Sequence, residues 1–246
     1  PTVGSWIQLG DEALTEMLAR VGFDWLCIDL EHTTISIDQA GRIIRVADLA
    51  GCPTLVRLSS HDPAQIKRVL DAGATGIIAP MVNTAEEAAR IVSAATYPPR
   101  GTRGVGLARA QQYGVGFPEY LERMNRDLVC IMQVEHIDGV DNLEEILAVA
   151  GVDGFFIGPY DLSASLGYPG AFDHPDVVAA MDRVAEVVKR PDVLAGAHVV
   201  EPDPDRLQQM IDGGYRFLAY ASDMLFFAHH LESVGADLKG VRGGVA

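Results

Sequence analysis

The chain has 246 residues, of which 48 % are hydrophobic and 22 % charged, so a large core is possible and intrinsic disorder is disfavoured. Acidic residues outnumber basic ones by 34 to 19, which gives a formal net charge of −15. A surface of this sign repels phosphate backbones and anionic bilayers, and this argues against nucleic-acid and membrane-surface roles. No apolar stretch of the sequence is long enough to span a bilayer.

The three cysteines, Cys27, Cys52 and Cys130, are widely spaced and odd in number. The sequence holds no CxxC motif, and this excludes a zinc ribbon or a dithiol redox motif. Cys27 and Cys130 lie inside apolar runs, where a buried and unreactive thiol is expected. This cysteine usage predicts a reducing, cytoplasmic compartment.

Short apolar runs recur along the chain, and each is followed by a turn and then by a helical pattern. They are rich in β-branched and aromatic residues and nearly continuous in hydrophobicity, which is typical of strands buried on both faces. The predicted strands are Val3–Leu9, Trp25–Asp29, Thr54–Leu58, Gly76–Ala79, Leu128–Val134, Gly154–Ile157, Leu194–Val199 and Phe217–Tyr220.

Helical windows separate these strands, and several of them begin with a capping signal, such as Asp62 before Pro63 or Thr84 before Ala85. The predicted helices are Glu12–Arg20, Ile37–Ala50, Pro63–Ala72, Ala85–Ala94, Leu143–Ala150, Asp176–Lys189, Pro204–Asp212 and Ser222–Ser233.

Eight strands alternating with eight helices predict a single (β/α)₈-barrel (TIM-barrel) domain over residues 1–246. An open doubly wound sheet is the competing fold, but no GxGxxG motif follows the first strand. The longest interruption of the pattern is Tyr97–Asp127, which we expect to be a loop that covers or builds a site.

Active sites of such barrels lie at the carboxyl ends of the strands, and several predicted strands end in polar residues. Asp29-Leu30-Glu31-His32 follows one strand, Arg57 another, Gln133-Val134-Glu135-His136 a third, and Gly158-Pro159-Tyr160-Asp161 a fourth. Charged groups at the ends of apolar strands are costly unless they are paired or bind an ion, so their convergence on one rim suggests a functional site.

Glu135 and Asp161 offer oxygen ligands on neighbouring strand ends, without a nearby cysteine. Two carboxylates suit Mg²⁺, Mn²⁺ or a similar ion that keeps open positions for water and substrate. The alternative is a pair of solvated turn carboxylates, with Asp161 only capping the helix that begins at Leu162-Ser163.

Arg57 and His32 are candidates for charge stabilisation and proton transfer. A fixed guanidinium at the barrel mouth could bind a carboxylate or a developing enolate, although a structural ion pair is equally consistent with the position of Arg57. His32 lies three residues beyond Asp29, where a carboxylate could orient the imidazole, but an isolated loop histidine is more often inert.

Two other kinds of catalysis are disfavoured. The sequence has no GxSxG motif for a serine nucleophile. The three lysines, Lys67, Lys189 and Lys239, lie in helical or terminal segments rather than at strand ends, and this disfavours an aldolase that forms an imine.

The motifs together resemble the HpcH/HpaI aldolase family of metal-dependent class II pyruvate aldolases, over nearly the whole chain. The resemblance rests on six elements in family order: GFDW at 22–25 leading into DLEH at 29–32, VR at 56–57, PMV at 80–82, YPPRGTRGVG at 97–106, QVE at 133–135 and FIGPYDLS at 156–163.

The resemblance implies reversible cleavage of 4-hydroxy-2-oxo acids to an aldehyde and pyruvate, or hydroxypyruvate, through an enolate. It implies that Glu135 and Asp161 hold a divalent ion (Mg²⁺, Mn²⁺ or Co²⁺) and that Arg57 contacts the keto oxygen. It assigns proton transfer to His32 with Asp29. Substrate-binding roles fall to Gln133 beside the bound pyruvate and to the segment Gly158, Pro159, Tyr160 and Asp161, whose amides cradle the carboxylate.

The family also implies a homo-oligomer, a hexamer or a trimer, with the last helix exchanged between neighbours. Two positions depart from the heptanedioate aldolases: Leu30 replaces a glycine, and Tyr160 replaces a small residue and could narrow the pocket. The alternatives are a lyase of the citrate-lyase β-subunit or malyl-CoA type, and a non-catalytic protein that binds 2-oxo acids.

Overall fold

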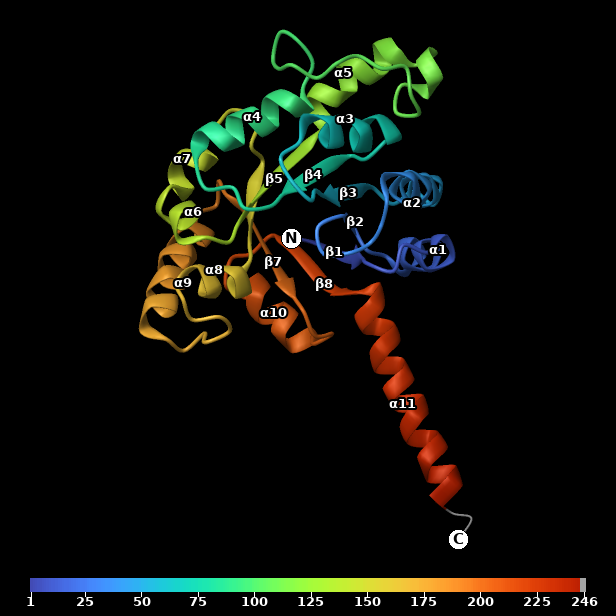
Figure 1. Cartoon of the computed structure of the whole chain (residues 1–246), viewed down its shortest axis with the longest axis vertical. Coiled ribbons are helices and arrows are strands. Elements are labelled where there is room, and N and C mark those ends of the chain that lie inside the picture. The colour runs from blue at the N-terminus through green and yellow to red at the C-terminus, as the bar shows by residue number, and fades with distance from the viewer. Residues whose placement is uncertain (244–246) are drawn as a thin grey trace.

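The computed structural model describes residues 1–243, and in it eight parallel strands close into a barrel in chain order, with β8 paired to β1 (Figure 1). This confirms the predicted (β/α)₈ fold. The strands are β1 (Thr2–Ile7), β2 (Trp25–Asp29), β3 (Thr54–Arg57), β4 (Gly76–Ala79), β5 (Val129–Val134), β6 (Gly154–Ile157), β7 (Leu194–Val199) and β8 (Phe217–Ser222).

Helices surround the strands on the outside of the barrel (Figure 1). They are α1 (Glu12–Val21), α2 (Ile37–Leu49), α3 (Pro63–Ala72), α4 (Ala85–Ala95), α5 (Phe117–Asp127), α6 (Ile137–Asp141), α7 (Leu143–Leu147), α8 (Pro159–Ser165), α9 (Pro175–Val188), α10 (Pro204–Asp212) and α11 (Asp223–Gly243), with one 3₁₀ turn at Gln112–Gly114.

Several segments differ from the sequence-based expectation. The last helix, α11, continues to Gly243, past the expected end at Ser233. The interruption 97–127 is not loop throughout, because its last eleven residues form α5. The amino end of α5 has no side-chain cap and is preceded by a glycine-rich stretch, so the usual start signal is missing. The single helix expected at 143–150 is only five residues long and is preceded by α6, because His136 caps a separate turn.

Most other helices begin where the capping residues predict. The Asp62 side chain accepts the amide of Ala64 ahead of Pro63, and Thr84 forms a reciprocal capping box with Glu87. Each such cap satisfies amide groups that have no partner within the helix, and this fixes where the chain leaves the barrel rim.

The barrel interior is packed in layers because alternate residues of each strand point inward. Trp25 stacks on Phe217 at a centroid distance of 4.2 Å, and above them Trp6 meets Phe156 edge-on at 5.8 Å. Gly4 is required in this packing, since a Cβ there would overlap the Trp25 ring. The next inward positions toward the carboxyl ends are polar, and they form the floor of a cavity.

The last helix, α11, leaves the barrel after its first turns and projects away from it (Figure 1). Phe226, in its first turn, packs against Phe23 and Tyr220. An apolar stripe beyond that point is exposed, with Leu231, Leu238 and Val241 each at least half accessible. Within residues 1–243, no helix has the length and apolar character needed to cross a membrane.

Candidate active site

A cavity of about 150 Å³ opens at the carboxyl ends of the strands. Most of the predicted site residues line it, namely Arg57, Gln133, Glu135, Gly158, Pro159, Tyr160 and Asp161. They come from three different strand ends, and period-two alternation along β2, β3 and β5 accounts for the inward direction of Asp29, Arg57 and Gln133.

Asp29 and Arg57 form a bidentate ion pair on neighbouring strands. Arg57 Nε donates to Asp29 Oδ1 at 2.9 Å and Arg57 Nη2 donates to Oδ2 at 2.6 Å, while Asp29 is fully buried. Burial alone would raise the pKa of Asp29, but the hydrogen bonds and charge of Arg57 outweigh it and hold this pKa below its usual value. The guanidinium also lies over the Trp6 ring, 4.5 Å from the centroid, so its orientation is fixed.

Glu31 and His32 follow Asp29 at the end of β2. None of these three residues lines the cavity, but Asp29 and Glu31 contact Arg57, which does. The backbone amides of both residues donate to Asp29 Oδ1, at 3.0 and 3.2 Å, so Asp29 holds His32 through the main chain. The imidazole is 59 % exposed, and its Nε2 lies 3.7 Å from Glu31 Oε2 rather than against Asp29.

The Glu31 carboxylate is the site group that sequence reasoning left without a role. Burial raises its pKa to about 7; Arg57 opposes this shift, and the charges of Glu135, Asp29 and Asp161 add to it. Its position next to His32 in the DLEH motif was visible in the sequence, but two of its three carboxylate neighbours, Glu135 and Asp161, come from other strand ends.

Glu135 is held by two donors at the base of the cavity. Its Oε1 accepts the amide of Met81 at 2.7 Å, and its Oε2 accepts Gln133 Nε2 at 2.5 Å. Met81 has a φ of +49°, a left-handed conformation that aims its amide at the carboxylate. Burial raises the pKa of Glu135, the two hydrogen bonds lower it, and the charge of Asp161 raises it further.

Asp161 lies in the first turn of α8 and is exposed. Its charge contributes to the raised pKa values of both Glu31 and Glu135, which shows that the three carboxylates share one electrostatic environment. At the start of this turn Gly158 leaves room for Glu135, because a Cβ at Gly158 would lie 2.8 Å from Glu135 Oε2. Tyr160 is 60 % exposed at the rim and meets Phe172 edge-on.

The donor set fits a hard divalent ion that also binds water and substrate. Glu135 and Asp161 supply carboxylates, and Gln133 Oε1 is a buried acceptor with no partner within the described residues. No cluster of three or more His, Cys, Asp or Glu residues that could hold a metal occurs among residues 1–243. Glu135, Asp161 and Gln133 would supply only part of a coordination shell, which would leave positions for water and a further oxygen ligand.

Six further residues line the cavity that were given no site role from the sequence, namely the apolar Phe156, Ile157 and Val200 and the three residues Trp6, Gln8 and His198. Trp6 and Gln8 belong to β1 and its end, and His198 belongs to β7. Inward alternation along Leu194, Gly196 and His198 could have identified the histidine, because it stands at the same level as the polar residues of the other strands.

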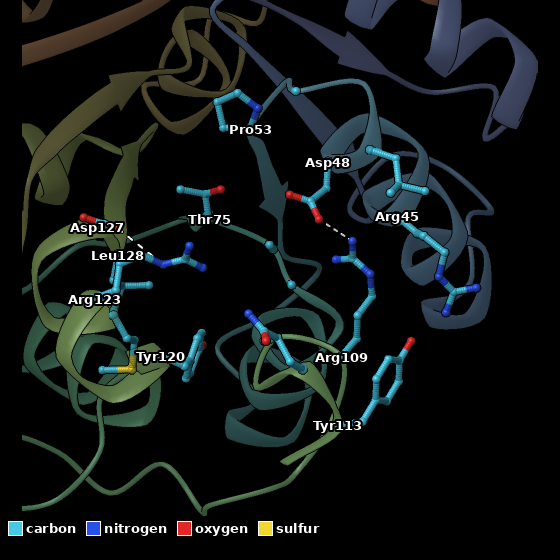
Figure 2. Close-up of a pocket in the computed structure, with 17 residues that line it drawn as sticks. Arg45, Asp48, Pro53, Thr75, Arg109, Tyr113, Tyr120, Arg123, Asp127 and Leu128 are labelled. Atoms are coloured by element: carbon cyan, nitrogen blue, oxygen red, sulfur yellow. Dashed lines mark hydrogen bonds and ion pairs between the residues drawn. The ribbon is translucent and has the colours of Figure 1, made fainter. Parts of the chain in front are cut away.

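A larger cavity of about 700 Å³ lies at the opposite, amino-terminal end of the strands, beside Pro53, Thr75 and Leu128 (Figure 2). Figure 2 shows Arg109 on one wall, paired with Asp48. Arg123 on another wall lies 3.6 Å from Asp127. Within each of these pairs the opposite charges largely balance, and the cavity lacks the converging carboxylates of the smaller one. The smaller cavity is therefore the candidate active site.

Comparisons with known proteins identify the family of the chain. The family model described as HpcH/HpaI aldolase/citrate lyase matches residues 2–230. A 2-keto-3-deoxy-L-rhamnonate aldolase of Escherichia coli is 39 % identical over 98 % of this chain and 90 % of its own length. A 4-hydroxy-2-oxo-heptane-1,7-dioate aldolase of Shigella sonnei is 37 % identical over 100 % of this chain and 95 % of its own.

Among solved structures, a HpcH/HpaI aldolase/citrate lyase family protein from Burkholderia cenocepacia superposes with a TM-score of 0.88 at 36 % identity, covering 98 % of this chain and 95 % of that one. Full-length relatives named as aldolases confirm the expectation of an aldolase and do not favour the acyl-CoA lyase alternative. The chain belongs to the HpcH/HpaI aldolase/citrate lyase family.

Proposed function

We propose that this aldolase reversibly cleaves 4-hydroxy-2-oxo acids to an aldehyde and pyruvate, or hydroxypyruvate, with a divalent ion held by Glu135 and Asp161. The observation that carries the proposal is the shared cavity, in which Arg57 at the end of β3, Gln133 and Glu135 at the end of β5, and Asp161 after β6 converge. A bound Mg²⁺, Mn²⁺ or Co²⁺ ion would polarise the carboxylate and keto oxygens of the oxo acid and so acidify its C3 protons.

Arg57 is suited to stabilise the negative charge that develops on the keto oxygen. Asp29 engages only Nε and Nη2 of the guanidinium, which leaves other N–H donors on a side chain that lines the cavity. Because the ion pair and the Trp6 ring fix the guanidinium, little reorganisation is needed when charge develops.

The carboxylate of the substrate would meet the start of α8. The Gly158 amide is already bonded to the carbonyl of Val134, and Pro159 has no N–H group. The amides of Tyr160 and Asp161 in the first turn are therefore the donors that remain for the substrate. Gln133 lines the same cavity, and its side-chain Oε1 has no hydrogen-bond partner among residues 1–243.

Protons would pass through His32, whose exposed imidazole lies next to Glu31, and Glu31 in turn contacts the cavity residue Arg57. In cleavage the 4-hydroxyl gives up its proton as the C3–C4 bond breaks, and C3 later regains one. Asp29 acts in this scheme by fixing the backbone at His32 and the guanidinium of Arg57. Glu31, next to the imidazole, is a second group placed to exchange a proton there.

The direct test is solvent-deuterium exchange into the methyl group of pyruvate, followed by NMR. We expect exchange with Mg²⁺, Mn²⁺ or Co²⁺, loss of exchange in EDTA, and recovery when metal is restored. Binding of pyruvate without any exchange would instead support the non-catalytic alternative. Exchange that persists unchanged in EDTA would contradict the role proposed for the ion.

A homo-oligomer, a hexamer or a trimer, is the second part of the proposal, and α11 is its basis. Its exposed apolar side chains recur at alternating spacings of three and four residues, which is the pattern of a helix seam that packs against another helix: Met224, Phe227, Leu231, Val234, Leu238 and Val241. A second copy of this chain is the proposed occupant, with α11 exchanged between neighbours.

Light scattering after size exclusion tests the assembly. We expect Leu231→Lys to reduce the molar mass toward that of the single chain, 26.4 kDa. Burying the lysine charge in the seam would cost free energy and weaken the association. The matched substitution Glu232→Lys, also on α11 but outside the seam, should leave the mass unchanged. A single-chain mass for the unmodified protein would contradict the proposal.

The proposal also places the protein in a reducing, cytoplasmic compartment. All three cysteines are buried free thiols, and burial raises the pKa of Cys27 and Cys130, which suppresses the reactive thiolate form.

A further inference from the structure

The wall of the cavity next to Arg57 carries two hydrogen-bond acceptors for which residues 1–243 provide no partner. This wall consists of Trp6, Gln8 and His198, from the first and seventh strands and the segment after the first. The Trp6 ring lies between the Arg57 guanidinium, 4.5 Å away, and the His198 ring, at a centroid distance of 5.9 Å.

The hydrogen bond of His198 settles which of its nitrogens can accept. His198 Nε2 lies 3.2 Å from the carbonyl oxygen of Ala221, and a carbonyl can only accept, so Nε2 carries the proton. Burial lowers the pKa of His198 to about 4, so the ring is neutral at physiological pH and Nδ1 bears a lone pair. No hydrogen bond within the described chain engages Nδ1.

Gln8 presents a second acceptor in the same way. Its Nε2 donates to Asp29 Oδ2 at 3.2 Å, and its backbone amide donates to Asp223 Oδ1 at 2.8 Å. Because the side-chain amide nitrogen is committed to Asp29, the orientation of the group is fixed. Its Oε1 is left as an acceptor with no partner among residues 1–243.

The pose of the proposed substrate determines which of its atoms faces this wall. With the C2 oxygen at Arg57 and the carboxylate at the start of α8, the remaining substituent of C2 is C3. In this pose C3 would face the remaining wall of the cavity, which Trp6, Gln8 and His198 form. A bare methyl group there would leave both acceptors unpaired, whereas a hydroxyl group could donate to one of them.

We propose that Gln8 and His198 select a 2-oxo acid with a hydroxyl group on C3, so that hydroxypyruvate is preferred over pyruvate as the three-carbon partner. The inference rests on the proposed function and names its substrate class. In the cleavage of a 3,4-dihydroxy-2-oxo acid, the 4-hydroxyl loses its proton and the C3–C4 electron pair passes to C3 and the keto oxygen. The aldehyde departs and C3 regains a proton. The C3 hydroxyl is retained throughout and only donates a hydrogen bond.

The test compares deuterium exchange at C3 of hydroxypyruvate and of pyruvate in the metal-loaded protein, as kcat/KM for each, with protein-free exchange subtracted. The wild type should favour hydroxypyruvate by about 10-fold or more, the size expected for one hydrogen bond in a partly desolvated site. His198→Leu should remove most of this preference by lowering the hydroxypyruvate value alone, and His198→Gln, which restores an acceptor, should recover part of it.

Retained exchange into pyruvate shows that the Leu variant is folded and keeps its catalytic groups. If that variant fails to fold, Gln8→Leu provides the same comparison from the other acceptor. A wild-type preference for pyruvate, or an equal fall for both donors in the variant, would overturn the selection by this wall. Exchange into neither donor by the wild type would instead overturn the proposed function, and this inference with it.

Discussion

Replacing Glu31 by glutamine is expected to stabilise the metal-free fold at neutral and alkaline pH. The Glu31 side chain is only 16 % exposed, and its Oε2 is buried with no hydrogen bond from the described residues, although Arg57 Nε lies 3.4 Å away. Burial, with the charges of Glu135, Asp29 and Asp161, raises the pKa of Glu31 against the opposing effect of Arg57. The charged form is therefore less favourable in the folded chain than in the unfolded one.

The size of the effect follows from the two pKa values. A rise from 4.5 to about 7 corresponds to roughly 3 kcal/mol at about 1.4 kcal/mol per unit. Solvent that reaches the Glu31 side chain screens part of this, so we expect about 1–2 kcal/mol. The pKa of Glu31 is higher in the folded chain than in the unfolded chain. The unfolding free energy of the wild type should therefore fall by this amount as pH rises from 4.5 to about 7.

Glutamine does not ionise, so the advantage of Glu31→Gln should be absent at pH 4, grow through that range and level off above pH 7. Urea denaturation in EDTA from pH 4 to 8, at fixed protein concentration, measures the difference in unfolding free energy between Glu31→Gln and the wild type. Glu145→Gln, at an exposed position on α7, is the matched control. A pH-independent difference, or a variant less stable than wild type at pH 8, would refute the reasoning.

Three other substitutions test the remaining parts of the site. Arg57→Lys cannot reproduce the bidentate contact with Asp29, so C3 exchange should fall by about 100-fold or more, as measured by NMR. Asp29→Asn leaves the guanidinium without its counter-charge and should lower the unfolding free energy by about 3–5 kcal/mol near pH 7. The pKa of Asp29 is lower in the folded chain than in the unfolded chain. The difference in unfolding free energy between wild type and Asp29→Asn should therefore narrow below about pH 4, when both proteins are titrated with acid. Tyr160→Ala opens the exposed rim and should raise kcat/KM for branched aldehydes relative to small ones without changing pyruvate exchange. An unchanged ranking of aldehydes would remove Tyr160 from the acceptor site.

The barrel was predictable because its strands are buried on both faces. Continuous apolar runs such as Trp25–Asp29 and Gly76–Ala79 end at turn residues, and their bounds match the structure. The helix α5 was not predictable in the same way, because its start lacks a side-chain cap and follows a glycine-rich stretch.

The candidate site was predictable at the level of strand ends but not of contacts. The rule that polar groups gather at carboxyl ends identifies Asp29, Arg57 and Glu135. It does not reveal that the guanidinium takes both oxygens of Asp29 while the imidazole of His32 turns to Glu31. Such choices depend on side-chain geometry across strands, which residue spacing along one strand does not contain.

Metal binding by Glu135 and Asp161 is the central claim, and calorimetric titration with Mn²⁺ tests it most directly. The wild type should bind one ion per chain, and Glu135→Gln and Asp161→Asn should each weaken binding by about 100-fold or more, because each removes one of two charged ligands. Glu145→Gln should bind as the wild type does. Unchanged Mn²⁺ affinity in both site variants would contradict the account.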